Sequence, residues 1–432
     1  MSIATEITRL QTAKSDLKTA IEGKGVTVPS ATKIDGYADL VESIQTGGGG
    51  TSAGWNDVNF WDYDGTIVAS YSSTDFANLS ALPDNPSHDG LTAQGWNWTL
   101  EDAKAHVNTY GILDIGQLYT TSDGKTLICV DIDKELLMIA IGFSSSAVGN
   151  VTIDWGDDSP TEISTEKAYT IYSHTYAEAG TYVIALSVQS GIVTLGGAGE
   201  SSGIISGLEQ AKKNALRYVH IGANANIGRH AFYRCLGLNY MTFPTSCNIP
   251  YDAKFDYSTM DVLILPHINS NVQITTEEAS MRAICFANQS VLYTDYRSMG
   301  YNTTLKRICI PFGNLNSQTF ANAFSLERIF LTTNITKIDA QRMQNLFSLR
   351  KLIIPSSVTS IANNALTETR SIKELHMTGA SVPSLGGTTF CNNAPSDFVI
   401  YVPYSADHSI LAAYQSATNW SSFASKMQEE PQ

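Results

Sequence analysis

Two acidic motifs in this sequence have the residue types and the spacing of a phosphoryl-transfer site. The first, Asp62–Thr66, reads DYDGT, so that one carboxylate could attack phosphorus while the next acts as general acid and base. The second, Gly156–Ser159, reads GDDS, and adjacent carboxylates supply the oxygen ligands that Mg²⁺ prefers. Whether this chemistry is real depends on the elements that would hold the two motifs.

The first motif resembles the DxDGT loop of haloacid-dehalogenase-type phosphatases, and the second resembles their acidic Mg²⁺ loop. In that family the attacking Asp ends a buried parallel strand, normally an unbroken apolar run. The preceding residues here, SAGWNDVNFW, are too polar, and the second motif lacks a further spaced acid. No Lys lies between Lys134 and Asp157, and no strand–helix–strand alternation connects the motifs. We therefore predict no catalytic residues, no cofactor and no metal site.

A repeated apolar pattern organises the region from Leu216 to Met377. It places aliphatic or aromatic residues at offsets 0, 3 and 5, with start-to-start spacings of 22, 22, 21, 24, 21, 23 and 23 residues. The copies are LRYVHI, LNYMTF, MDVLIL, MRAICF, LKRICI, LERIFL, LRKLII and IKELHM. This period predicts a leucine-rich-repeat solenoid whose short strands stack into a parallel sheet.

Offsets 2 and 4 of each repeat must face outward if offsets 0, 3 and 5 face the core. Stacking then aligns an aromatic end, an apolar middle and a basic end on one surface, which would suit an anionic glycan or an acidic protein. The candidate ligand-binding residues are Tyr218, Tyr240, Arg307, Arg328, Phe330 and Lys351. The alternative is that the three cations pair with carboxylates of neighbouring domains or subunits.

The half of each repeat that connects one strand to the next indicates the type of leucine-rich repeat. IGRHAFYRCLGL, from Ile227 to Leu238, resembles the BspA type of leucine-rich repeat in its Ala-Phe pair and its Cys. Between Pro244 and Thr304 the connections depart from that pattern, which predicts irregularity there. The resemblance implies adhesion or recognition, because such arrays occur in bacterial surface proteins, related eukaryotic proteins and phage-encoded proteins.

The first 50 residues are predicted to form a helical attachment segment and a glycine linker. Its apolar stripe follows heptad spacing and predicts self-association, with a trimer favoured; packing within its own domain is the alternative. The stripe comprises Ile3, Ile7, Leu10, Leu17 and Ile21. The segment KTAIEGKGVTVPSATKIDGYADLVESI resembles N-terminal segments of tail and other structural proteins from phages of gut bacteria. That resemblance implies attachment to other virion proteins.

Two further units precede the repeats. Residues 51–127 predict a small aromatic-rich α+β domain, with a helix that starts at Thr99 and Asp102. In residues 128–196, VTIDWGDDSP and SHTYAEAGTYVIALSV resemble PKD-type immunoglobulin-like domains, which usually act as spacers. For His174 and Asp157 we expect a structural hydrogen bond rather than a metal pair. The solenoid is predicted at 197–402, and a cap with a frayed MQEEPQ tail at 403–432.

Composition limits the partners and the compartment. The net charge of −14, with 16% charged residues and 20 Tyr, lacks the basic footprint of a nucleic-acid binder. No apolar stretch reaches the length of a membrane span, and the polar N-terminus has no signal-peptide core. None of the six cysteines forms a CxxC pair, which predicts buried free thiols.

Together these features predict a mainly β, multidomain, non-enzymatic protein. Our first interpretation is a phage virion protein, assembled in the host cytoplasm, that acts as a tail fibre or receptor-binding protein on a host-surface glycan or protein. A phage head decoration or fibre protein and a bacterial cell-surface adhesin are the alternatives.

Overall fold

The computed structural model describes residues 57–431, apart from short gaps, together with Lys14 and Lys18. The gaps are 198, 200–201, 207–212, 251–252, 267–273, 288–298, 311–318, 332 and 334. The predicted oligomerisation stripe and the glycine linker lie outside the described residues, so self-association stays a prediction.

The α+β domain consists of a four-stranded sheet and two short helices. The strand order is β2-β1-β4-β3, with β1 and β4 parallel and the other pairs antiparallel. Its elements are β1 (Val58–Trp61), β2 (Ile67–Tyr71), α3 (Ser73–Ala77), β3 (Leu91–Trp96), α4 (Leu100–Tyr110) and β4 (Leu113–Thr121). Phe60, Phe76 and Val107 belong to its own small core.

Helix α4 begins where the sequence predicts. The Thr99 hydroxyl accepts a hydrogen bond from the Asp102 backbone amide at 3.2 Å, which satisfies an otherwise unpaired amide at the helix start. Gly111 ends the helix in the left-handed conformation at φ 82°, which glycine adopts without steric cost. Ala103 and Val107 turn the apolar side of α4 toward the sheet.

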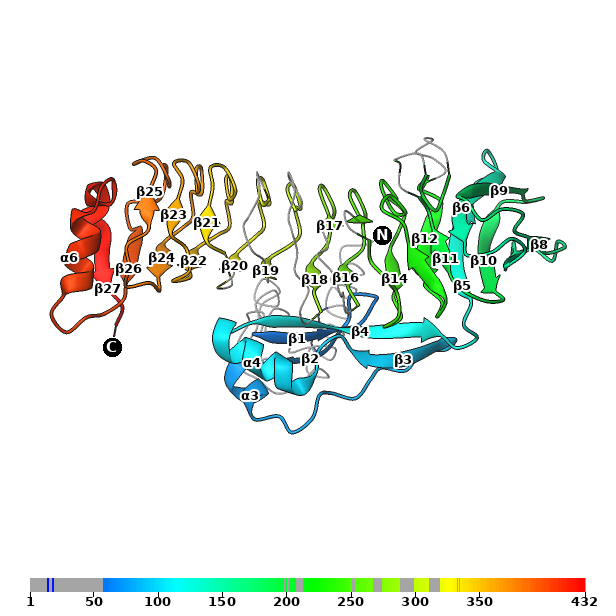
Figure 1. Cartoon of the computed structure of the whole chain (residues 1–432), viewed down its shortest axis with the longest axis horizontal. Helices are drawn as coiled ribbons and strands as arrows, with labels where there is room; N and C mark the ends of the chain where they lie inside the picture. Colours follow the sequence, from blue (N-terminus) through cyan, green and yellow to red (C-terminus); the bar gives the residue numbers. More distant parts are fainter. Residues whose placement is uncertain are drawn as a thin grey trace, which may run out of the picture.

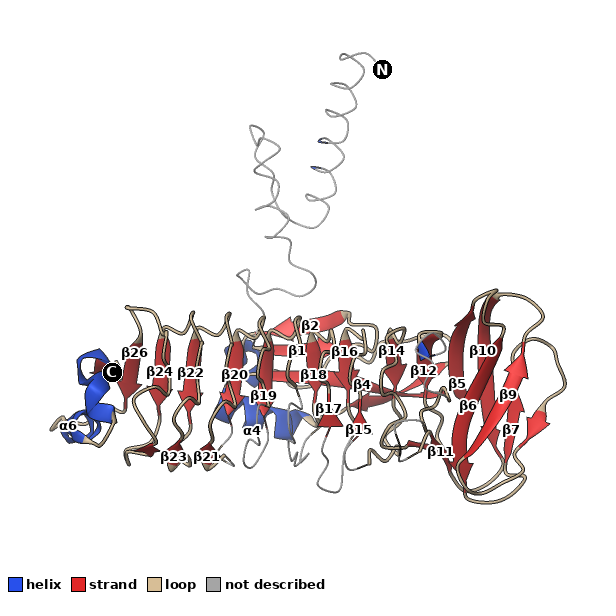
Figure 2. Cartoon of the chain, turned by 90° about the horizontal axis from the view of Figure 1, so that it is seen from above, coloured by secondary structure: helices blue, strands red, loops and turns tan. Residues whose placement is uncertain are grey.

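Two facing sheets follow at one end of the molecule (Figure 2). One carries β5 (Thr126–Ile132), β7 (Val151–Asp154), β8 (Glu162–Ile163) and β10 (Gly180–Val188), and the other carries β6 (Met138–Ser145), β9 (Thr170–Thr175) and β11 (Val193–Leu195). The predicted strands around Ile153 and Ile184 are confirmed as β7 and β10, which pair antiparallel. Their inward residues share one core.

Both sheets continue into the repeats. Strand β12 (Leu216–His220) pairs antiparallel with β5, and β13 (Ala225–Ile227) pairs parallel with β11. The Gly/Ser-rich stretch between them contributes Ile204 and Ile205, both buried, to the shared core. The two-sheet unit therefore packs directly on one end of the solenoid and is not separated from it by a linker.

The solenoid has a longer and a shorter row of strands (Figure 1). The longer row continues from β12 with β14 (Tyr240–Thr242), β16 (Val262–Ile264), β18 (Ala283–Cys285), β19 (Arg307–Ile310), β20 (Arg328–Leu331), β22 (Lys351–Ile354) and β24 (Glu374–Met377). The shorter row continues from β13 with β15 (Ala253–Lys254), β17 (Ile274–Thr275), β21 (Lys337–Ile338), β23 (Ser360–Ile361) and β25 (Ser384–Leu385). Every residue at offsets 0, 3 and 5 whose side chain the structure describes is buried, which confirms the predicted inward set.

A left-handed residue recurs in the turn before the strands of the longer row. Arg234, Tyr257, Tyr301, Asn322 and Asn345 all have φ between 57° and 65°. Asn tolerates this conformation better than Arg or Tyr, because its short polar side chain bonds locally. Nδ2 of Asn345 also donates to Oδ1 of Asn322 at 2.7 Å, which joins the left-handed residues of two successive repeats. Residues 251–252, 267–273 and 288–298, a part of each connection between Pro244 and Thr304, lie outside the described residues, so the predicted irregularity remains untested.

The cap closes the other end of the solenoid. Strand β26 (Val399–Val402) extends the longer row, helix α6 (Ser409–Ser416) and the 3₁₀ helix η2 (Trp420–Lys426) follow, and Trp420 is buried. The prediction of a frayed tail is wrong, because β27 (Met427–Glu429) pairs parallel with β26. Met427, the first residue of β27, is buried, and the Glu429 carboxylate lies 2.7 Å from Nδ1 of His408.

The α+β domain lies against the longer strand row near the middle of the solenoid (Figure 1). Strand β4 contacts β14, β16 and β18. Cys129, Cys235, Cys247, Cys285 and Cys391 are buried free thiols, as predicted. Among the described helices, none is long and apolar enough to cross a membrane.

Candidate recognition surface

The outward positions of the longer row align into columns. In β19, β20 and β22 the offset-2 residues Arg307, Arg328 and Lys351 are direct register partners. Phe330 and Ile353 pair in the same way at offset 4. Parallel pairing places equivalent offsets side by side, so the predicted columns exist. We call the surface formed by offsets 2 and 4 the outer face.

The α+β domain covers the outer face from β12 to β19, which we call the covered part. The Asn97 amide donates to the carbonyl oxygens of Leu265 and Cys285, at 3.1 Å each. The indole of Trp98 donates to the carbonyl oxygen of Phe286 at 2.6 Å. These bonds end on backbone carbonyl oxygens at the ends of β16 and β18, so the domain is fixed to the backbone of the solenoid.

Arg307 belongs to this interface and not to an open binding surface. Its side chain is 2% exposed, and its Nη2 and Nε lie 2.6 and 3.1 Å from the two carboxylate oxygens of Asp114 in β4. The Trp61 indole donates to the same carboxylate at 2.7 Å. The prediction that Arg307 contacts ligand is thus wrong. The alternative, pairing with a carboxylate of a neighbouring domain, describes Arg307 correctly.

Arg282 contributes further contacts to the same interface, at the edge of the α+β domain. Nη2 of Arg282 donates to the Gly65 carbonyl oxygen and to the Asp261 carboxylate, both at 2.9 Å. Its guanidinium also lies 5.5 Å from the ring centroid of Trp61. Cations attract the negative faces of aromatic rings, so this contact joins the domain to the repeats.

Tyr218 and Tyr240 also face the α+β domain. Their rings are stacked, with centroids 5.1 Å apart, and the ring of Tyr63 lies 5.1 Å from that of Tyr240. Burial raises the pKa of Tyr218 to about 12. Burial, with a smaller contribution from nearby His88, lowers the pKa of His220 in the same cluster to about 4. The aromatic end of the predicted surface is therefore half-buried packing against the β1–β2 turn.

The DYDGT motif is that turn. The Asp62 amide donates to the Thr66 carbonyl oxygen at 2.8 Å, and the Thr66 amide donates to Asp64 at 2.9 Å. The side chain of Asp62 is 4% exposed, and its carboxylate accepts from the hydroxyl of Tyr119 at 3.0 Å, while Nε2 of His88 lies 2.7 Å away. Both oxygens of the carboxylate that would have to attack phosphorus are thus engaged in holding a hairpin.

The GDDS motif is a separate turn after β7. Asp157 lies 2.7 Å from Nε2 of His174, and the imidazole of His174 stacks on buried Trp155 with centroids 5.0 Å apart. The hydroxyl of Tyr176 donates to the Trp155 carbonyl oxygen at 2.9 Å. This is the structural hydrogen bond that we expected. No group of three or more potential metal ligands occurs in the described part of the chain.

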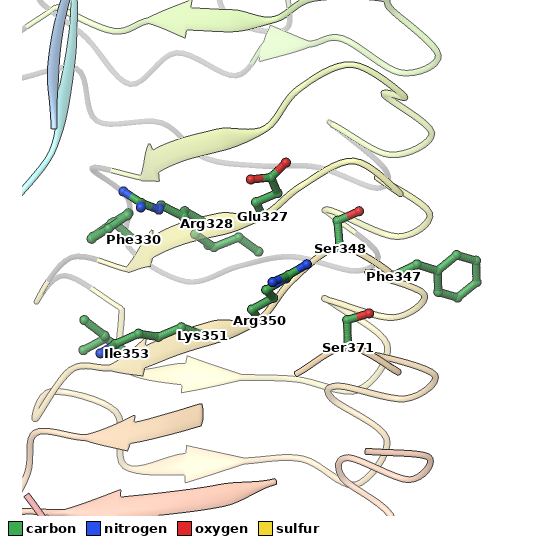
Figure 3. Close-up of a pocket in the computed structure, with 10 residues that line it drawn as sticks. Glu327, Arg328, Phe330, Phe347, Ser348, Arg350, Lys351, Ile353 and Ser371 are labelled. Atoms are coloured by element: carbon green, nitrogen blue, oxygen red, sulfur yellow. The ribbon is translucent and has the colours of Figure 1, made fainter. Parts of the chain in front are cut away.

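The outer face at β20 and β22, which we call the open part, is not covered. Arg328 and Lys351 are exposed, Phe330 and Ile353 are half-buried, and all four line a pocket of about 830 Å³. Figure 3 shows Phe330 and Ile353 at one end of this group, and Phe347, Ser348 and Ser371 at the other. The ammonium of Lys351 lies 3.4 Å from the Glu374 carboxylate. Because both side chains are exposed, this ion pair holds Lys351 only weakly in place. Of the six predicted residues, Arg328, Phe330 and Lys351 thus line one site.

A second pocket, which the sequence did not reveal, adjoins the open part. It has a volume of about 630 Å³ and lies between α3 and α4 on one side and Phe330 and Ile353 on the other. Arg350, at an edge of the first pocket, was also missed, because it occupies offset 1 and not an outward column. No local spacing could place α4 beside β20, which follows it by more than two hundred residues.

A family model matches the repeats of this chain. The model of the BspA type leucine rich repeat region matches six copies over residues 212–311 and 297–396. Residues 212–396 form a BspA-type leucine-rich-repeat solenoid. A search of curated proteins finds no match.

Three solved structures are similar at low identity. A leucine rich cell surface protein from Faecalibacterium prausnitzii is 14% identical, with a TM-score of 0.26, over 46% of this chain and 63% of that one. A leucine-rich repeat protein from Bacteroides ovatus is 12% identical, with a TM-score of 0.37, over 66% and 75%. The pneumococcal vaccine antigen PcpA is 16% identical, with a TM-score of 0.23, over 50% and 66%. The chain spans just under two thirds of the first and third of these proteins.

Proposed function

We propose that this chain is a non-enzymatic recognition protein that binds an anionic ligand on a cell surface through the open part of its outer face. The observation that carries the proposal is the pocket of about 830 Å³ around Arg328, Phe330 and Lys351. In a chain of net charge −14, a basic and partly apolar pocket on a rigid sheet is suited to acidic groups. Leucine-rich-repeat solenoids typically bind partners through such extended surfaces.

The location of the protein is a separate part of the proposal. The three similar structures are described as bacterial proteins, and none of the three as a phage protein. The resemblance that predicts a virion protein rests largely on the first 45 residues, which lie outside the described part. We therefore place the bacterial surface adhesin first and the phage tail or head protein second. Immunolabelling of bacterial cells and of purified phage particles distinguishes the two.

The binding test is a charge reversal in the open part. Arg328→Glu with Arg350→Glu is expected to lower the binding of the purified protein to a panel of bacterial and animal cells, and added salt should mimic the effect. The matched control is Lys167→Glu with Lys337→Glu, which changes the net charge equally at exposed positions away from the pocket. Equal binding by both variants would overturn the proposed surface.

Assembly remains a further proposal. The stripe from Ile3 to Ile21 would hold a homotrimer, which would present several copies of the open part to one surface and so raise its avidity. Light scattering of the full chain and of a variant lacking residues 1–46 measures this. Two monomeric samples at micromolar concentration would show that the stripe does not drive assembly.

A further inference from the structure

The two pockets beside β20 and β22 share part of their lining. Phe330 and Ile353 border both the pocket of about 830 Å³ and the pocket of about 630 Å³ beneath α3 and α4. Each volume lies in the range of roughly 300–1,000 Å³ that is common for ligand sites. At the far side, the Tyr110 hydroxyl lies 3.3 Å from Oγ1 of Thr333, so α4 reaches the solenoid here. The two pockets adjoin at Phe330 and Ile353 and have walls from two domains, and together we call them the composite cleft.

The charge of the composite cleft is opposite to that of the chain. Its described lining contains four cationic residues, Lys104, Arg328, Arg350 and Lys351, and one carboxylate, Glu327. Glu327 lies 3.7 Å from Lys306, and Lys351 lies 3.4 Å from Glu374. Within the part of the chain that the structure describes, Arg328 and Arg350 have no carboxylate within ion-pair distance. Two exposed guanidiniums are thus available to bind carboxylates bidentately.

The floor of the cleft is apolar and not flat. Ile353 is branched and Phe330 is half-buried, while Phe76 and Val107 line the α3–α4 side. Such a floor fits an aliphatic or aromatic side chain, whereas sugar rings stack on flat, exposed aromatic faces. The exposed ring in the pocket lining, Phe347, lies at the opposite end from Phe330 and points away from the group (Figure 3).

We propose that the composite cleft binds an acidic protein segment, with its carboxylates on Arg328 and Arg350 and an apolar side chain between α4 and Ile353. This inference rests on the proposed function and adds the class of ligand and the participation of the α+β domain. An acidic glycan is the other outcome that the experiment distinguishes.

The experiment uses the full chain and two kinds of probe. Short fluorescein-labelled peptides, in which one Phe or Leu lies between pairs of Glu, are compared by fluorescence anisotropy with the same peptides carrying Gln. Polygalacturonate and heparin are the glycan probes. We expect the Glu peptides to bind and the Gln peptides to bind at least about tenfold more weakly, because buried or bidentate charge contacts are worth more than about 1.4 kcal/mol each.

Two pairs of variants locate the bound peptide. Arg328→Glu with Arg350→Glu should abolish binding, whereas Lys167→Glu with Lys337→Glu should not. Asn108→Trp places a large ring in the cleft from an exposed position on α4 and should weaken binding about tenfold. Ala105→Trp, on an exposed position of the same helix outside the cleft lining, should leave binding unchanged.

The outcomes separate this inference from the proposed function. If the glycans bind and the Glu peptides do not, with the glycan binding lost on charge reversal, the function stands and the peptide assignment is overturned. If charge reversal abolishes peptide binding but Asn108→Trp has no effect, the α+β domain is not part of the site. If charge reversal changes neither cell binding nor probe binding, the proposed function itself is wrong.

Discussion

On the outer face of the longer strand row, the repeats from β12 to β19 lie under the α+β domain, whereas those of β20 and β22 are open. The same two offsets point outward in both parts. In the covered part they carry Val262, Ile264 and Ala283, all buried, and the paired Arg307. In the open part they carry Arg328 and Lys351, both exposed.

The difference shows that the offset of a residue in its repeat decides whether its side chain points inward or outward, but not what that side chain contacts. Arg307 and Arg328 are register neighbours in adjacent strands. Arg307 is nevertheless buried in an ion pair with Asp114, whereas Arg328 is exposed. An outward residue of a solenoid can thus serve either an intramolecular interface or a ligand.

Arg307→Ala should have the largest effect on stability. The change leaves Asp114 buried beside Trp61 without its cation, and an uncompensated buried charge costs about 3–5 kcal/mol. Urea unfolding measures the loss, and limited proteolysis shows whether the α+β domain has detached. Arg307→Met with Asp114→Asn should recover most of the loss, since the Asn oxygen still accepts from the Trp61 indole. A loss no larger than that of Arg328→Ala would contradict the buried pair.

Gly116→Ala should disturb the same interface by overpacking. A Cβ at this position in β4 would overlap the side chain of Ile264 in β16. Inserting a methyl group into a close-packed contact costs about 1–3 kcal/mol. Gly180→Ala in β10 is the matched control, because its Cβ meets only Tyr182 at an ordinary 3.5 Å. Equal stability of the two variants, measured by thermal unfolding, would argue against close packing between β4 and β16.

Acid should weaken the covered part through His220. Its pKa is lowered to about 4 in the folded protein, so the unfolded chain binds the proton first as the pH falls. The stabilising contribution is therefore complete above the ordinary pKa of about 6.5 and decreases between about pH 6.5 and pH 4. Between about pH 7.5 and pH 5 the loss should be about 2 kcal/mol.

His220→Gln is the variant that isolates this term. Gln retains hydrogen-bonding capacity toward Thr242, whose Oγ1 lies 3.0 Å from Nδ1 of His220. Urea unfolding of both proteins at the two pH values gives the difference. If the His220→Gln variant loses as much stability on acidification as the protein that retains His220, another titratable group causes the pH dependence.

Elements set by local pattern could be predicted from the sequence. The inward residues of the repeats follow from a short pattern and its period, and the start of α4 follows from Thr99 and Asp102. The docking of the α+β domain could not be predicted, because Asp114 and Arg307 are 193 positions apart and neither lies in a spacing motif. β27 was missed because a short, mostly polar tail is not long enough to show the alternation of a strand. It forms a strand by pairing with β26, which local sequence does not indicate.

One signal for the covered part was present in the sequence. Val262, Ile264 and Ala283 occupy outward offsets, and a contiguous apolar patch on a sheet face normally requires a cover. The basic end gave no comparable signal, because Arg307, Arg328 and Lys351 look alike in one column. Only the contact with Asp114 separates the first of them from the other two.

Lys351→Ala should have the smallest effect on stability. Lys351 is the register partner of Arg328, and its ammonium lies 3.4 Å from Glu374, with both side chains more than two fifths exposed. Exposed pairs of this kind contribute about 0–1 kcal/mol, and salt screens them, so the free energy of unfolding should change by less than about 0.5 kcal/mol. Urea unfolding at low and high salt measures it beside Arg307→Ala. A loss above about 1 kcal/mol would mean that the open part, like the covered part, is built into the fold, and its cations would then no longer be free to serve a ligand.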